Sequence, residues 1–266
     1  MVEPFKHETL RQLNCFREHN NLIAGITTRQ GGHSQKPFDT LNMGLHVPDH
    51  KETVLDNRGE LANEVGIPLE QWTIGEQIHD TKIKTVTKGD CGKGAFSHTS
   101  ALAGVDGLIT NQPNVLLAAF YADCVPLFFC DPTNGWIGVA HAGWKGTVKG
   151  MASHMVRELV TQGCNLETIQ MTIGPCISSR NYEVDQRVKD EIPEAHQNET
   201  VMEIGNNKYL LDLKKLNEKV AIEAGVQSSN VFASEYCTYE EDALFYSHRR
   251  DQGKTGRMLG FIGWKS

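Results

Sequence analysis

A nearly continuous apolar stretch in the middle of the chain, residues 114–142, places the strongest constraint on what this sequence can fold into. Short polar breaks at "ADC" and "DPTNG" divide the stretch into three runs. Apolar runs of this length, rich in Val, Leu and Phe and bounded by turn residues, are typical of buried strands. We therefore expect consecutive strands in the interior of a sheet.

The rest of the chain alternates between strand-like and helix-like segments without a regular repeat. Further strands are predicted at 21–28, 71–79, 82–87, 105–110 and 169–178, helices at 50–65, 144–163 and 208–225, and two strands around a polar turn within 243–264. The helices are indicated by apolar residues at helical spacing and by glycines at or just after their ends. Because strands and helices are interleaved irregularly, we expect an α+β fold, one domain over residues 1–266 with a mixed β-sheet core and flanking helices.

Composition limits the classes of function. The chain has 266 residues, a net charge of −7 and a pI near 5.9, whereas a nucleic-acid or anionic-membrane surface needs an excess of basic residues. No apolar run reaches the ~18 residues that span a bilayer, and the N-terminus lacks the apolar core of a secretory signal. The seven cysteines are scattered and include no C-x-x-C pair. We therefore expect reduced thiols, a cytoplasmic protein and no four-thiolate zinc site.

Three residues with metal-ligating side chains stand in or beside these predicted strands: His79, Cys124 and His141. Their wide separation excludes a local zinc knuckle. Ligands from separate strands are typical of catalytic zinc sites, which use three protein ligands and keep a further position open. Taken singly, each residue also has an ordinary interpretation, as a small buried cysteine or a hydrogen-bonded histidine.

The sequence around these residues resembles the signature blocks of the bacterial laccase-domain family. The blocks are "GEQIHD" at 75–80, "ADCVPLFFCDP" at 122–132 and "GVAHAGWKGT" at 138–147. Further blocks occur along the chain in the same order as in the family: "TTRQGGHS" (27–34), "LNMGLHV" (41–47), "GVDGLIT" (104–110), "IGPCIS" (173–178), "YEV" (182–184) and "YSHRRDQGKTGR" (246–257). The resemblance covers nearly the whole chain and implies that His79, Cys124 and His141 are metal ligands. Three positions depart from the family pattern without removing a ligand: Asp80, Lys145 and His248.

The family was first described as multicopper polyphenol oxidases and later as purine nucleoside phosphorylases with adenosine deaminase activity. Multicopper oxidases hold several coppers through H-x-H pairs, and this chain contains no H-x-H. One Cys-His-His set holds one metal. We therefore expect zinc, with copper only as an adventitious occupant favoured by the Irving–Williams order, and we do not expect laccase activity.

The resemblance implies a zinc-dependent phosphorylase that acts on adenosine, inosine and S-methyl-5′-thioadenosine, deaminates adenosine, and forms a homodimer. Its partners would be purine nucleosides and phosphate. The candidate substrate-binding residues are Arg29, Asn42, Gly44, Arg249, Arg250 and Arg257, where the arginines supply positive charge for phosphate and Asn42 and Gly44 could equally form a plain turn.

Asp123 and Glu183 are the candidate catalytic carboxylates, for proton transfer or for orienting a ligand histidine. Neighbouring residues on an extended strand point to opposite faces, so Asp123 can act beside Cys124 only if the strand bulges.

Two other classes of function use the same residues. In a metal-free cysteine hydrolase or amidase, for instance in peptidoglycan precursor editing, Cys124 would be the nucleophile, His141 the base, and Asp123 or Asp131 the orienting acid. In a non-enzymatic binding protein, a fourth ligand from His33, His46 or His248 would close the metal site. Metal content and coordination distinguish these alternatives.

Overall fold

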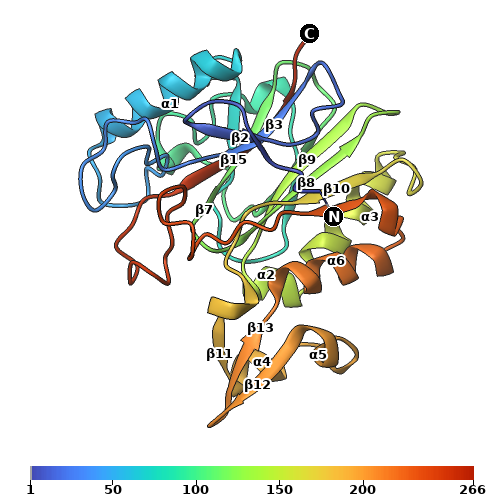
Figure 1. Cartoon of the computed structure of the whole chain (residues 1–266). Helices are drawn as coiled ribbons and strands as arrows, with labels where there is room; N and C mark the ends of the chain where they lie inside the picture. The colour runs from blue at the N-terminus through green and yellow to red at the C-terminus, as the bar shows by residue number, and fades with distance from the viewer. Residues whose placement is uncertain (1) are drawn as a thin grey trace.

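Two six-stranded mixed sheets form the centre of the structure, a computed structural model that describes residues 2–266 (Figure 1). The first sheet has the order β1 (Lys6–His7), β2 (Gln12–Asn14), β3 (Leu22–Thr27), β15 (Met258–Trp264), β7 (Leu116–Tyr121) and β4 (Trp72–Ile74). The second has the order β14 (Val231–Ala233), β10 (Gln170–Ile173), β8 (Val125–Asp131), β9 (Trp136–Ala142), β6 (Gly107–Thr110) and β5 (Ile83–Thr85). The apolar stretch therefore supplies one strand to the first sheet and two to the second.

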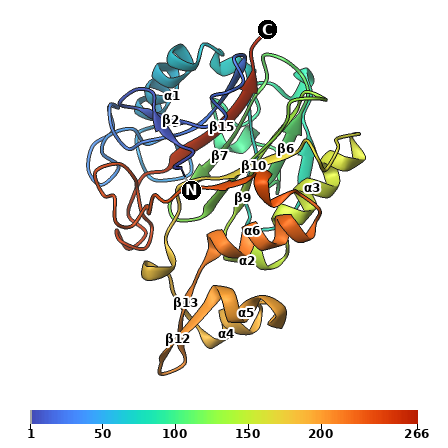
Figure 2. The same ribbon diagram turned by 45° about the vertical axis from the view of Figure 1, so that its right-hand side comes forward.

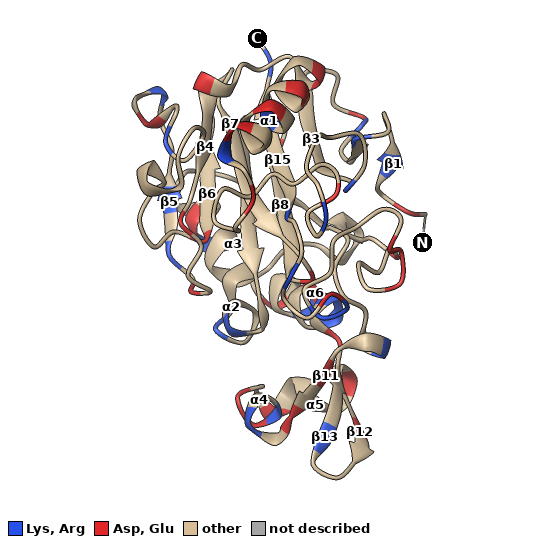
Figure 3. Cartoon of the chain, turned by 90° about the vertical axis from the view of Figure 1, so that its left-hand side faces the viewer, with Lys and Arg blue, Asp and Glu red and all other residues tan. Residues whose placement is uncertain are grey.

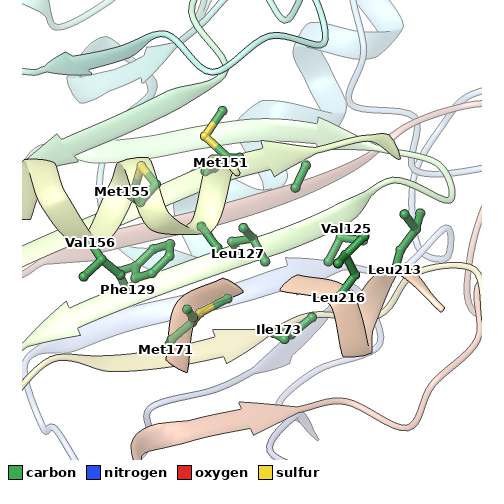
Figure 4. Packing of buried hydrophobic residues seen from close by; sticks show 14 of the residues in the cluster. Val125, Leu127, Phe129, Met151, Met155, Val156, Met171, Ile173, Leu213 and Leu216 are labelled. Carbon is green, nitrogen blue, oxygen red and sulfur yellow. The ribbon is translucent and has the colours of Figure 1, made fainter. Parts of the chain in front are cut away.

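The two sheets pack face to face, and helices cover their outer faces. Alternation along β8 shows the arrangement, because successive side chains of a strand point to opposite faces. Phe128 and Cys130 join the cluster between the sheets, whereas Leu127 and Phe129 pack outward against α3 (Met151–Thr161) and α6 (Leu213–Glu223) (Figure 4). A strand buried on both faces has no polar alternation, which explains the continuous apolar run.

Helix α1 (Lys51–Val65) covers the outer face of the first sheet. Leu61, Ala62 and Val65 pack there with the outward side chains of β4, β7 and β15. The helix ends at Gly66, whose φ of 67° is the left-handed conformation that glycine adopts without strain.

A third, three-stranded sheet projects from this body (Figures 1 and 2). Its order is β11 (Glu183–Asp185), β13 (Lys208–Leu211) and β12 (Val201–Gly205), with α4 (Gln186–Asp190) and α5 (Glu194–Thr200) beside it. The short helix α2 (Trp144–Val148) and α6 lie between the body and this sheet (Figure 2). Acidic and basic residues are interspersed over both parts (Figure 3). Within residues 2–266, no helix combines the length and the apolar character needed to cross a membrane.

The expected α+β class, with mixed sheets and flanking helices, is confirmed. The helix predicted at 144–163 is divided into α2 and α3, because Gly150 between them has a φ of 80°. The segment 208–225 begins with strand β13, and α6 starts only after Asp212, whose side chain accepts the backbone N–H of Lys215. Within 243–264 only β15 is a strand, and the polar residues before it form turns.

Candidate metal and substrate site

The three predicted metal ligands lie together. One potential ligand atom from each of His79, Cys124 and His141 falls within 4.8 Å of the other two. The sulfur of Cys124 is 4.0 Å from Nε2 of His79, and the two imidazole rings meet edge to face with centroids 4.7 Å apart. Three donors this close can hold a single metal ion.

Strand pairing explains why residues far apart in sequence converge. Strands β8 and β9 are antiparallel, with Val125 opposite Ala142 and Pro126 opposite His141. Cys124, immediately before β8, therefore lies next to the end of β9. His79 arrives from a loop, because β4 ends at Ile74 rather than at the predicted position 79.

A buried carboxylate, Asp106, connects two of the ligands. Its Oδ1 accepts a hydrogen bond from Nδ1 of His141 at 2.9 Å and from the backbone N–H of His79 at 3.0 Å. Its Oδ2 accepts the backbone N–H groups of Ile78 and Asp80. Burial alone would raise the pKa of Asp106, but the hydrogen bonds from His141 and from the backbone outweigh it, and the pKa is lowered. The carboxylate is therefore ionised and fixes both the His141 ring and the 78–80 loop.

Cys124 and His141 polarise each other. Burial by itself raises the pKa of the Cys124 thiol, but the charge of His141 and hydrogen bonds from both histidines outweigh burial and lower that pKa to about 6. Burial likewise opposes protonation of His141, yet the Cys124 thiolate and Asp106 raise its pKa to about 9. The thiolate is the form in which cysteine binds metals and acts as a nucleophile.

The backbone is unusual at this site. His79 has a φ of 63° and Asp123 a φ of 82°, both in the left-handed region that non-glycine residues rarely occupy. Gly143, the N-cap of α2, approaches the ligands closely: a Cβ added there would lie 2.7 Å from Cδ2 of His79 and 3.2 Å from the sulfur of Cys124. Strained residues and close backbone approaches of this kind cluster at functional sites.

The ligand group lies in the wall of a pocket of about 540 Å³, a volume within the range of small-molecule sites. The other lining residues are His46, Gly75, Glu76, Gln77, Ile78, His98, Phe120, Ala122, Asp123, Trp144, Ile177, Tyr182, Leu213, His248, Arg249 and Arg257. Aromatic rings, aliphatic side chains and arginines thus surround the three ligands. Such a mixed lining suits a ligand with both a flat ring and an anionic or polar part.

Of the two predicted catalytic carboxylates, the structure brings only Asp123 into the pocket. The link from β7 to β8 passes from the first sheet to the second, and the bend places Asp123 and Cys124 in the same pocket wall. The Asp123 carboxylate accepts hydrogen bonds from the hydroxyls of Thr238 and Ser247 and from the backbone N–H of Arg249. With three donors, it holds the C-terminal loop against the site.

Glu183 lies outside this pocket. Its side chain is exposed, and Oε1 is 2.8 Å from Nζ of Lys208. Only its backbone carbonyl is connected to the pocket, because it accepts a hydrogen bond from Nη1 of Arg249.

The four candidate arginines are distributed over different environments. Arg249 and Arg257 line the pocket. Arg250 donates to the backbone carbonyls of Thr238, Tyr239 and Phe245 and pairs with Asp251. Arg29 lines a separate pocket of about 490 Å³, where it donates to the carbonyls of Asp39 and Asp242.

Asn42 and Gly44 do not line the pocket but contact residues that do. Asn42 is fully buried, and its Oδ1 accepts the backbone N–H groups of Gly44 and Arg257. A Cβ on Gly44 would lie 3.0 Å from Cγ of Arg257 and 3.1 Å from Cε1 of His46. Gly44 therefore permits the close packing of Arg257 and His46.

The histidines considered as a fourth ligand do not join the group. Across residues 2–266, the group able to hold a metal contains His79, Cys124 and His141. His46 and His248 line the same pocket outside that group, and the exposed His33 lies near Glu60. The arrangement leaves room for a further, non-protein ligand.

Sequence reasoning missed Asp106, and also His98 as a lining residue. Asp106 falls within the quoted block "GVDGLIT", directly before strand β6. A carboxylate at the start of a fully buried strand, in a chain with two candidate ligand histidines, is the signal that could have identified it, because ligand histidines usually donate their second ring N–H to such a group.

Comparisons with known proteins match nearly the whole chain, although the descriptions of the matches differ. The sequence model of the family described as "Multi-copper polyphenol oxidoreductase laccase" matches residues 23–265. The chain is 46% identical over 256 residues to a Bacillus subtilis protein named purine nucleoside phosphorylase YlmD, covering 94% of this chain and 91% of that protein.

Solved structures match the fold closely. YlmD from Geobacillus stearothermophilus has a TM-score of 0.95 at 43% identity and covers all of both chains. Bacillus licheniformis hypothetical protein YfiH has a TM-score of 0.97 at 42% identity, over 99% of this chain and 100% of that one.

Proposed function

This chain belongs to the multi-copper polyphenol oxidoreductase laccase family, the laccase-domain family, and on that premise we propose that it is a zinc-dependent purine nucleoside phosphorylase that also deaminates adenosine. Its substrates are adenosine, inosine and S-methyl-5′-thioadenosine, together with phosphate. The observation that carries the proposal is one pocket in which the His-Cys-His group meets two arginines, Arg249 and Arg257. Relatives named purine nucleoside phosphorylase, at 46 and 47% identity, support it.

The donor set fits zinc. One thiolate and two imidazoles form an accepted set for catalytic zinc, and Asp106 already occupies Nδ1 of His141, which leaves Nε2 for the metal. His79, Cys124 and His141 would hold the ion. A single group of three donors within residues 2–266 does not match the several copper sites of a multicopper oxidase. Zinc, when bound, would supply a Lewis acid that activates water near neutral pH.

The protein's own residues bind and orient the substrates. Tyr182 and Trp144 offer aromatic surfaces against which a purine can stack. Arg249 lies over the Tyr182 ring, 5.1 Å from its centroid, and so stiffens that part of the pocket. Asp123 anchors the backbone of Arg249, and Asp106 keeps His141 and the 78–80 loop in place.

The two reactions make different demands on the pocket. In phosphorolysis, a phosphate oxygen forms a bond to C1′ of the ribose while the C1′–N9 bond breaks and the purine takes a proton, which gives the free base and ribose 1-phosphate. In deamination, water adds at C6 of adenine and ammonia leaves, which gives inosine. Only phosphorolysis needs an anion site, so deamination should proceed without phosphate.

The test is to incubate the purified, metal-loaded protein with adenosine, with and without phosphate, and to separate the products by chromatography. We expect inosine in both conditions, and adenine or hypoxanthine only with phosphate. Cys124→Ala should abolish both reactions and reduce bound zinc, as measured by elemental analysis. If no product forms above the Cys124→Ala background, the proposed function is wrong.

A second candidate, a metal-free cysteine hydrolase, is favoured by the polarised Cys124–His141–Asp106 series. A thiolate beside an imidazolium that a carboxylate orients is the arrangement of a cysteine nucleophile. Chelation separates the two candidates. A metal-dependent phosphorylase loses activity on chelation and regains it with zinc, whereas a cysteine hydrolase keeps amidase activity without metal and is inactivated by thiol alkylation.

A further inference from the structure

Three side chains of basic residue types line the pocket together with the ligand group: His46, His98 and Arg257, here called the basic cluster. The rings of His46 and His98 have centroids 5.7 Å apart. His46 and Arg257 both pack against the space that a Cβ on Gly44 would fill. Residues from three distant segments of the chain thus form one contiguous patch.

Arg257 has hydrogen-bonding capacity to spare. Its Nη1 donates to the backbone carbonyls of Thr255 and Gly256, and within residues 2–266 its Nε and Nη2 have no partner. The two carboxylates that line the pocket do not form an ion pair with it: Asp123 accepts three other donors, and Oε2 of Glu76 accepts the backbone N–H of Gly104. A half-buried guanidinium with free N–H groups and no ion-paired carboxylate is suited to an anionic ligand.

His46 adds a neutral donor to the cluster. The His46 ring packs on Phe120 with centroids 5.1 Å apart. Desolvation in the pocket, followed by the charge of Arg257, lowers the pKa of His46 to about 3. A neutral imidazole presents one N–H donor without repelling the guanidinium. In the described chain, the imidazoles of His46 and His98 bond to no other protein group, so their nitrogens are available to a ligand.

The cluster is held in place before any ligand arrives. Asn42 accepts the backbone N–H groups of both Gly44 and Arg257 and donates to a carboxylate oxygen of Asp49. Phe120 is fixed in turn by Gln77, which bonds to its backbone N–H and carbonyl. Preorganised donors lower the cost of ordering the site on binding.

We propose that the basic cluster is the phosphate subsite of this pocket, with Arg257 as the charged anchor and His46 and His98 as further donors. The proposal rests on the proposed phosphorylase function for its ligand. It assigns phosphate to Arg257 rather than to Arg249, which is stacked on Tyr182, or to Arg29, which lies in another pocket. The nucleoside then occupies the part of the pocket lined by Trp144 and Tyr182.

Binding of inorganic phosphate to the metal-loaded protein, measured by isothermal titration calorimetry without nucleoside, tests the assignment directly. Loss of a charge-assisted contact predicts roughly 10- to 100-fold weaker phosphate binding in Arg257→Gln. Gly44→Ala keeps every charge but adds a methyl group 3.0 Å from Cγ of Arg257 and 3.1 Å from Cε1 of His46, so it should weaken binding as well. Arg187→Gln, at a side chain 79% exposed on helix α4 beside the projecting sheet, is the matched control and should bind phosphate as the wild type does.

Kinetics provide the second readout. In Arg257→Gln the KM for phosphate should rise about as much as the Kd. Thermal unfolding and zinc content show whether each variant is intact. If Arg257→Gln does not fold, Gly44→Ala decides the question.

The outcomes separate this proposal from the proposed function. Unchanged phosphate binding in both Arg257→Gln and Gly44→Ala overturns the subsite. Phosphate binding that is lost on metal removal but kept in Arg257→Gln also overturns it, since the anion then binds at the ligand group. Phosphate binding that depends on Arg257 in a protein with no phosphorolysis supports the anion subsite and refutes the phosphorylase.

Discussion

Nδ1 of His141 lies 2.9 Å from Oδ1 of Asp106, and the same oxygen accepts the backbone N–H of His79. One buried carboxylate therefore orients two of the three candidate metal ligands. It leaves Nε2 of His141 free for the metal. At the same time it fixes the loop at His79, whose backbone is in the left-handed conformation. The site depends on this residue although it is not itself in the ligand group.

Asp106→Asn should weaken zinc binding about 10- to 100-fold, the usual effect of removing such a carboxylate. Asparagine keeps the shape but replaces one acceptor with an N–H₂ donor. Affinity is measured by competition with a chromophoric chelator. Asp80→Asn, which alters the neighbouring surface pair with Lys149, is the control. Equal affinities in the two variants would contradict the role given to Asp106.

Gly143→Ala should also reduce zinc affinity and activity, for a steric reason. The added methyl would lie 2.7 Å from Cδ2 of His79 and 3.2 Å from the Cys124 sulfur, so the exposed His79 ring must move. Gly146→Ala lies in the same short helix, where the added Cβ makes only ordinary contacts at 3.4 Å and beyond. The same chelator titration should show near wild-type affinity for Gly146→Ala; a matched loss there would point to helix disruption instead.

Asp123→Asn should lower both stability and activity. Asparagine tolerates a φ of 82°, so the change tests the carboxylate and not the backbone. Replacing one oxygen by a donor leaves at least one of Thr238, Ser247 and the Arg249 N–H unsatisfied, at a cost of about 1–3 kcal/mol.

Glu183→Gln, which breaks a surface pair worth about 0–1 kcal/mol, should remain close to wild type. Urea unfolding and adenosine turnover are measured for both variants. A large loss of activity in Glu183→Gln alone would restore that residue to the mechanism and remove Asp123.

Much of the fold could be predicted because its signals are local. The apolar run through β7, β8 and β9 and the spacing in α1 are visible in short windows. The secondary-structure predictions were wrong where a tertiary contact determines the conformation of the segment. β13 reads as the start of a helix, yet it pairs with β11 and β12. The segment before β15 reads as a strand, yet its polar groups bond elsewhere. Asp123, from outside the segment, accepts the Ser247 hydroxyl and the Arg249 N–H, and Arg250, within it, donates to the carbonyl of Phe245.

The site shows the same division. The ligand types of His79, Cys124 and His141 could be identified from sequence, because few side chains bind metals. The environment of an arginine could not, because it depends on which segments meet in space. Arg29 and Arg257 look equivalent in sequence, yet they line different pockets.

Arg29→Gln should therefore leave the KM for phosphate within about twofold of wild type and mainly affect stability. The Arg29 guanidinium donates to the carbonyls of Asp39 and Asp242 and lies over the Tyr246 ring, 4.8 Å from its centroid. It joins the 27–34 segment to the C-terminal region. Phosphorolysis kinetics and thermal unfolding are compared with those of Arg257→Gln. A large rise in the phosphate KM for Arg29→Gln would return the anion site to the second pocket.

The interaction of Asp251 with Arg250 and Thr255 should make the free energy of unfolding depend on pH. These residues belong to the loop that carries Arg249 and Arg257. Burial by itself raises the pKa of Asp251, but hydrogen bonds from Arg250 and Thr255 outweigh it and lower the pKa. Since the folded pKa lies below the unfolded value of about 3.9, the stabilisation is fully present above that value. It is lost as pH falls through the folded pKa.

Asp251→Asn should accordingly be less stable than wild type by an amount that is constant between about pH 5 and 7 and shrinks below about pH 4. The free energy of unfolding, from urea titrations at several pH values, measures this difference. Asp242→Asn, at an exposed position of the same segment, controls for the change in net charge. A difference for Asp251→Asn that stayed constant down to pH 3 would show that the ionised carboxylate does not hold the loop carrying Arg249 and Arg257.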